Sequence, residues 1–157
     1  MILEKCLAYL LAFLMGLMVV DVTWQVLTRF ILTDPSSFTE ELARFTLIWI
    51  GLMGAAFAFR RHSHLSLNLI MNKASEQKKR LLVRFSHLMC FLFAASVMVF
   101  GGVKLMSLTL SLNQISPALN IPIGYVYSCI PLSGLLICWF AFEAILHPEE
   151  AIEAGSL

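Results

Sequence analysis

The sequence predicts an all-α membrane protein that forms a single domain, residues 1–157, of four transmembrane helices. Composition is the first reason, because 59% of the residues are hydrophobic and only 13% are charged, whereas a soluble domain carries about 25% charged residues. The second reason is a set of four long apolar stretches. The third is a single loop that holds most of the positive charge. A chain so poor in charge is typical of an integral membrane protein.

A helix needs about 20 residues to cross the hydrocarbon core; the second apolar stretch is slightly shorter than this, and the first and last are longer. The first follows Lys5 and could be taken for a signal peptide. However, Asp21 ends its first apolar run without a small-residue cleavage site, so we expect a retained span. Pro131 predicts a kink in the last stretch. The predicted spans are residues 6–32, 42–59, 85–103 and 121–146.

The loop of residues 60–84 sets the expected orientation. It contains seven cationic residues and one acidic residue, Glu76. Basic loops between spans remain on the cytoplasmic side, so we expect both termini to be cytoplasmic as well. Such clusters contact anionic lipid headgroups rather than nucleic acid. The residues expected at the headgroups are Arg60, Arg61, Lys78, Lys79 and Arg80.

Part of this loop, residues 64–79, combines apolar and cationic side chains. Such a segment can lie along the headgroup region, so we predict a short amphipathic surface helix between the second and third spans. A disordered loop is the alternative, because the apolar residues do not keep a strict helical period.

The start of the second span has the densest polar chemistry. Ser37 and Glu40 match the capping-box pattern that begins a helix, and Glu40 and Arg44 fall on one helix face. A short connection brings the end of the first span nearby. Four charges therefore gather at the outer rim, and they form either a local ion network or a docking surface for another protein. They are Arg29, Glu40, Glu41 and Arg44.

The second span also carries small residues at spacings of three and four. This spacing lets helix backbones approach closely in lipid. The contact is either within this four-helix unit or with a partner subunit. The small residues are Gly51, Gly54, Ala55 and Ala58, and Trp49 beside them is expected to be a packing residue.

Asp21, well inside the first span, is the costliest residue of the chain to insert, since a carboxylate near the bilayer midplane costs about 3 kcal/mol on insertion scales. It must be protonated, hydrated or paired. Pairing with a neighbouring helix or a partner is the favoured interpretation, and a proton relay is the alternative.

The residues indicate neither an enzyme nor a cofactor site. His62 and His64 lack a third metal ligand nearby, so no metal site is predicted. His87 is the one histidine inside a span, which does not suffice for a haem-binding pair. The four cysteines lie in or beside apolar stretches without C-x-x-C spacing and are expected to be small buried hydrophobes.

The stretch from Trp24 to Leu69 resembles the small membrane subunit of TRAP transporters, the DctQ-like family. The second half of the chain resembles it only in layout. The matching features are an Arg-aromatic pair closing the first span, a Thr-Glu-Glu-Leu-x-Arg start of the second, a Gly-Ala-rich middle and a basic exit. In this chain they are Arg29-Phe30, Thr39-Glu40-Glu41-Leu42-Ala43-Arg44, Gly54-Ala55-Ala56 and Arg60-Arg61-His62-Ser63-His64-Leu65.

The resemblance implies a non-catalytic scaffold subunit in the bacterial inner membrane. Its partners would be a large elevator-type membrane subunit, which it braces, and a periplasmic substrate-binding protein, for which it helps form a docking surface. Such systems import organic acids, of the sialic acid or C4-dicarboxylate class, with a sodium gradient. The alternative function is an autonomous proton-coupled exporter that uses Asp21, and a membrane redox anchor is a third.

Overall fold

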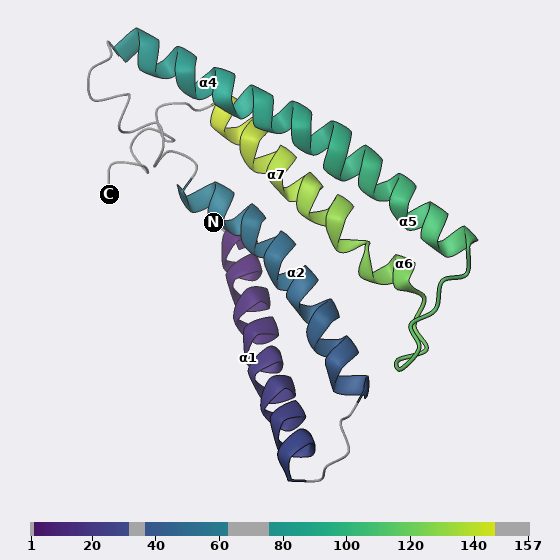
Figure 1. Ribbon diagram of the computed structural model, residues 1–157. Helices are drawn as coiled ribbons and strands as arrows, with labels where there is room; N and C mark the ends of the chain where they lie inside the picture. The colour runs from purple at the N-terminus through teal and green to yellow at the C-terminus, as the bar shows by residue number, and fades with distance from the viewer. Residues whose placement is uncertain (1, 32–36, 63–75, 147–157) are drawn as a thin grey trace. The chain divides into compact units, whose positions relative to one another are not determined.

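The computed structural model describes residues 2–31, 37–62 and 76–146, which form an all-helical protein (Figure 1). Apolar composition and helix-compatible residues continue through each stretch, so the backbone bonds within itself as lipid requires. In chain order the elements are α1 (Ile2–Phe30), α2 (Ser37–His62), α4 (Glu76–Phe93), the π-helix η1 (Ala94–Gly101), α5 (Gly102–Ser111), α6 (Ile123–Val126) and α7 (Cys129–Leu146).

Four helical stretches are long and apolar enough to cross a membrane, which confirms the predicted fold class. The expected surface helix between the second and third spans falls mainly on residues 63–75, which lie outside the described residues. The cytoplasmic placement of the termini stays a prediction. The four stretches are Leu3–Phe30, Ser37–Arg61, Arg80–Ser111 and Ile123–Leu146.

The third stretch is longer than the predicted span of residues 85–103. The predicted span ends before Lys104, but α5 continues through this residue to Ser111. Lys104 is exposed on the helix surface, where its long side chain can reach toward water while the backbone remains helical. The middle of the stretch is η1, whose i→i+5 hydrogen bonds make a wider turn than those of an α-helix.

The fourth stretch is interrupted rather than kinked at its proline. α6 ends at Val126 and α7 begins at Cys129. Pro131 is therefore in the first turn of α7, where its missing N–H costs no helical hydrogen bond. Just before it, the backbone N–H of Ser128 bonds to the carbonyl of Tyr125 at 3.2 Å, which closes a turn between the two helices.

The chain divides into two compact units. Unit 1 comprises Met1–Gly54 and Lys104–Cys129, and unit 2 comprises Ala55–Val103 and Ile130–Leu157. Unit 1 thus contains α1, the first part of α2, most of α5, and α6 with the segment that joins it to α5. Unit 2 contains the second part of α2, α4, η1 and nearly all of α7.

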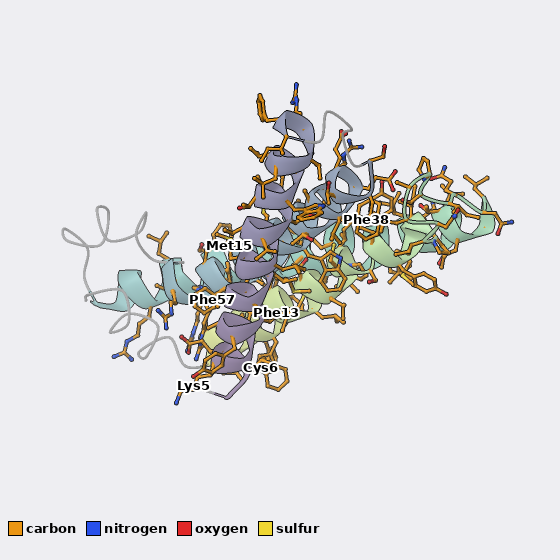
Figure 2. All side chains as sticks on the ribbon, turned by 90° about the horizontal axis from the view of Figure 1, so that it is seen from below. Lys5, Cys6, Phe13, Met15, Phe38 and Phe57 are labelled. Carbon is orange, nitrogen blue, oxygen red and sulfur yellow. The ribbon has the colours of Figure 1, made fainter. Side chains whose placement is uncertain are left out.

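In unit 1, one side of α1 is covered and the rest is exposed. Figure 2 shows side chains extending from α1 on all sides, among them Phe13 and Met15, which are 67% and 51% exposed. The covered positions recur at alternating steps of three and four residues, the period of two helices packed along a seam. We call them the α1 seam: Leu7, Leu11, Leu14, Met18, Asp21, Gln25 and Thr28.

In unit 2, α7 runs alongside α4 and η1 (Figure 1), and glycines set how closely the helices pack. A Cβ added at Gly134 would lie 2.7 Å from Met98 Cβ, and one at Gly102 would lie 2.9 Å from the Cδ of Pro131. Neither distance leaves room for a methyl group. In unit 1, Gly124 of α6 makes a similar approach to Leu110 of α5, at 2.5 Å. Close backbone packing of this kind stabilises helix pairs in lipid.

A two-pronged ion pair also joins α2 to α7 in unit 2. The two guanidinium nitrogens of Arg60 lie 3.0 and 3.1 Å from the two carboxylate oxygens of Glu143. The same guanidinium lies 5.5 Å from the ring centroid of Phe140. Parallel bonds of this geometry are the strong form of the arginine–carboxylate pair. The pair therefore links residues that are far apart in the sequence.

Replacement of Gly134 by Ala is expected to destabilise the protein, because the added methyl group has to displace Met98 or the backbone. Overpacking of this kind costs about 1–3 kcal/mol. Thermal unfolding of the isolated chain in detergent measures the effect. The matched control is Gly51→Ala, since a Cβ at Gly51 meets nothing within 4 Å, and loss of a helix-interior glycine stabilises by roughly 0.5–1 kcal/mol. Equal unfolding midpoints for the two variants would contradict this packing.

A double-mutant cycle on Arg60→Met and Glu143→Gln is expected to give a favourable coupling energy. We expect about 1 kcal/mol, toward the low end of the range for contacting residues, because solvent partly screens the Glu143 side chain, which is 38% exposed. The free energy of unfolding in detergent is the measurement. Additive effects of the two substitutions would show that the pair does not contribute to stability.

Candidate functional site

The carboxylate of Glu41 lies at the centre of the most connected polar group in unit 1. Its Oε2 atom accepts hydrogen bonds from the hydroxyl of Ser116 and from the backbone N–H groups of Ala118, at 3.1 Å, and Leu119, at 3.2 Å. A deprotonated carboxylate only accepts hydrogen bonds, so three donors suit it. We call Glu41, Ser116, Ala118 and Leu119 the Glu41 cluster.

Glu41 is positioned by the start of α2. It lies in the second turn of a helix that begins at Ser37, where the N-terminal end of the helix dipole favours negative charge. Ser116 is fully buried in unit 1. The hydrogen bonds therefore connect the first turns of α2 to a segment more than seventy residues later, which lies between α5 and α6.

The segment 112–122 is folded by its own backbone. The N–H of Ser116 bonds to the carbonyl of Ile121 at 3.0 Å, and the N–H of Asn120 bonds to the carbonyl of Ser116 at 2.9 Å. Asn113 and Asn120 have positive φ angles of 48° and 55°, which asparagine tolerates better than most residues. These turns leave the N–H groups of Ala118 and Leu119 directed at Glu41, so that the carboxylate satisfies two backbone donors of the segment.

Glu40 and Arg44 form a second, more exposed pair beside the cluster. Arg44 Nη2 lies 3.0 Å from Glu40 Oε1, and the side chains are 64% and 62% exposed. A pair of this kind on one helix stabilises by only about 0.3–0.5 kcal/mol. Both charges are therefore available to a partner. A hollow of about 380 Å³ opens here, lined by Ser37, Glu40, Glu41, Arg44, Pro117 and Ala118.

The four residues of the predicted outer rim are thus placed differently. Glu40 pairs with Arg44, and Glu41 binds the segment 112–122 instead of an arginine. Arg29 is exposed in the last turn of α1, and it forms no ion pair within residues 2–31, 37–62 and 76–146. The described structure therefore brings three of the four together at the start of α2.

The small-residue positions of α2 face open space in the parts of the chain that the structure describes. A Cβ at Gly51 or Gly54 meets nothing within 4 Å. Ala55 and Ala58 are exposed, and Trp49 is half-buried. The close helix contacts lie instead at the glycines of the third and fourth stretches.

The basic residues have mixed surroundings. Arg60 pairs with Glu143 and its side chain is only 29% exposed, so its guanidinium group binds the protein and is only partly open to its surroundings. Arg61 stacks over Phe57 at 4.9 Å, and Arg80 is exposed. Lys78 and Lys79 lie in the first turn of α4.

Asp21 is 7% exposed and lies on the α1 seam. Its Oδ2 atom has no hydrogen-bond partner among the described residues. The cysteines are all free, and burial was predicted for each. Cys129 is buried, whereas Cys6 is exposed, because it falls outside the seam.

No group of three metal-ligating side chains is present in residues 2–31, 37–62 and 76–146.

Sequence reasoning missed the segment 112–122 as the partner of Glu41. The turn-forming residues of the segment were a usable signal, because Asn113, Pro117 and Asn120 favour turns. The pairing itself leaves no local pattern. The Arg60–Glu143 pair was missed for the same reason.

Comparison with known proteins identifies the family. A family model described as the DctQ component of tripartite ATP-independent periplasmic transporters matches residues 7–150. A TRAP transporter small permease protein of Haemophilus influenzae is 28% identical over 134 residues, which are 85% of this chain and 81% of that protein. The sialic acid TRAP transporter small permease protein of Vibrio cholerae is 33% identical over 88 residues, 56% of this chain and 51% of that protein.

Some similar proteins are much longer. The isethionate TRAP transporter permease protein of Oleidesulfovibrio alaskensis is 31% identical over 128 residues, which are 73% of this chain but 19% of that protein. With four helices able to cross a membrane, this chain is a multi-pass protein of the inner membrane. It belongs to the DctQ family, the small permease subunits of TRAP transporters.

Proposed function

We propose that this chain is the non-catalytic scaffold subunit of a three-part importer, in which it braces a large permease subunit. The family match over residues 7–150 carries the proposal. The longer relatives support it, because the region similar to this chain is about a fifth of a larger permease chain in two of them. We infer that the separate chain packs on its large permease as the similar region does within the longer chains.

The open side of α2 is the part that we assign to the large subunit. Gly51 and Gly54 leave space for a close helix contact that the described chain does not itself use. Because small residues allow backbones to approach in lipid, a helix of the large permease would fit there. Of the two interpretations of these residues, packing on a partner is therefore the one that we propose.

The Glu41 cluster and the adjacent pair of Glu40 and Arg44 form the proposed docking surface for a periplasmic substrate-binding protein. They lie at the opposite end of α2 from Arg60 and Arg61. If the basic end is cytoplasmic, as the positive-inside bias favours, then the Ser37 end faces the periplasm. The backbone of the docking surface would be held in place, because the Glu41 carboxylate accepts hydrogen bonds from the segment 112–122.

The transported solute is proposed to be an organic acid, of the sialic acid or C4-dicarboxylate class, driven by a sodium gradient. Relatives named for sialic acid and for C4-dicarboxylate support this class. Other relatives are named for isethionate and ectoine. Since similar small subunits serve such different solutes, we assign substrate selection to the partner chains.

Reconstitution tests the proposed function. Liposomes that contain this chain, its large permease and the binding protein are expected to take up the organic acid when sodium is higher outside. Liposomes with this chain alone are expected to show no uptake. Transport by the chain alone, abolished by Asp21→Asn, would instead support the autonomous proton-coupled exporter.

Replacement of Glu41 by Ala is expected to weaken docking, because the N–H groups of Ala118 and Leu119 lose their acceptor and the segment 112–122 loses its tie to α2. Uptake by the reconstituted complex is measured against the concentration of binding protein. The concentration for half-maximal uptake is expected to rise about 5- to 30-fold, which corresponds to the roughly 1–2 kcal/mol of an unsatisfied hydrogen-bonding group.

The matched control for this substitution is Glu40→Ala, which removes the same charge from the adjacent, exposed position. It is expected to have a smaller effect, because Glu40 does not hold the segment. If both variants kept the wild-type dependence on binding protein, the docking role of the cluster would be excluded.

A further inference from the structure

Asp21 is buried on a helix that is otherwise largely exposed. It is 7% exposed, whereas the adjacent Val20 is 69% exposed. Large apolar side chains are exposed on the other sides of α1, among them Phe13 and Met15 (Figure 2). The exposed faces of α1 are therefore largely apolar and similar to one another, whereas the face that carries Asp21 holds a buried carboxylate.

In lipid, the apolar faces of a helix are nearly interchangeable, because lipid tails are as apolar as leucine. Polar groups are not interchangeable in this way, since exposure to hydrocarbon leaves them unsatisfied. The hydroxyl of Thr23 bonds to the carbonyl of Val19 at 2.7 Å, and that of Thr28 bonds to the carbonyl of Gln25 at 3.0 Å. Both threonines thus satisfy themselves within the helix, whereas Oδ2 of Asp21 has no partner among the described residues.

The buried positions of α2 within unit 1 are seven residues apart, and the buried positions of α1, which are Leu7, Asp21 and Thr28, are likewise separated by multiples of seven. Thr39, Thr46 and Met53 are 5%, 6% and 4% exposed. A common period of seven is the signature of two helices packed along one seam. Successive helices with a short connection, here residues 31–36, pack antiparallel. In an antiparallel pair, a step of seven residues back along α1 matches a step of seven residues forward along α2. This register places Thr28 opposite Thr39, Asp21 opposite Thr46 and Leu14 opposite Met53.

We propose that Asp21 fixes the rotation of α1 about its own axis, so that the α1 seam faces α2 and not the lipid. Thr46 is the polar side chain that the register places opposite Asp21. Apolar character alone does not select this face, because Phe13 and Val20 are apolar as Leu14 is. This inference goes beyond the proposed function, since it concerns the assembly of unit 1 and holds whatever the chain transports.

Cysteine cross-linking in membranes reports the rotation directly. The full chain, co-expressed with its large permease, carries Met53→Cys together with either Leu14→Cys or Phe13→Cys. The native cysteines are replaced by alanine. A short bifunctional thiol reagent is expected to join positions 14 and 53 efficiently and positions 13 and 53 poorly. Phe13 is the matched control, because it adjoins Leu14 but is 67% exposed.

Three variants then test the role of Asp21. Asp21→Asn keeps a polar group and is expected to keep the 14–53 product. Asp21→Leu is expected to lose the selectivity, so that both products form. Asp21→Leu combined with Val20→Asp moves the polar group by one residue, about 100° around the helix, and is expected to transfer the product from 14–53 to 13–53.

Three results would overturn the proposal. They are persistence of the 14–53 product in all variants, loss of selectivity in Asp21→Asn, and absence of the 14–53 product with Asp21 intact. Asp21→Leu makes the span more apolar, so the membrane insertion of α1 is not impaired. The variant that combines Asp21→Leu with Val20→Asp tests the rotation of α1 independently.

Discussion

Apolar side chains gain little by leaving lipid for protein, and this constraint shapes the whole chain. A helix pair in a bilayer is held by close backbone contact and by polar groups that avoid hydrocarbon. The described residues show both devices. Gly102 and Gly134 bring the third and fourth stretches together, while the bonds of Glu41 and the Arg60–Glu143 pair join segments that are distant in sequence. Most residues of the four apolar stretches are not buried within the described structure.

The two polar contacts differ in character. Glu41 binds backbone N–H groups and a hydroxyl, so it fixes the path of a segment that has no helix of its own. Arg60 and Glu143 bind each other and thus hold two helices. In the proposed function the first contact shapes a surface for a soluble partner, and the second stiffens the frame that supports the large permease.

The sequence was sufficient for the fold class and the family, because hydropathy and span length follow directly from the bilayer. It also located the polar start of α2. It was insufficient for the partners of Glu41 and Arg60, since each lies more than seventy residues away and leaves no periodic signal. The extension of α5 past Lys104 was missed because a charge at the end of an apolar run resembles a span boundary. The small residues of α2 were recognised, but sequence spacing does not say which helix occupies the space beside them.

Hydrogen–deuterium exchange of the segment 112–122 is the most direct test of the central claim, which is that a single carboxylate holds this segment to α2. In the wild-type chain, peptides containing Ala118 and Leu119 are expected to exchange slowly. In Glu41→Ala the same peptides are expected to exchange much faster, while peptides from α1 remain unchanged. Equal exchange of these peptides with and without the Glu41 carboxylate would contradict the account.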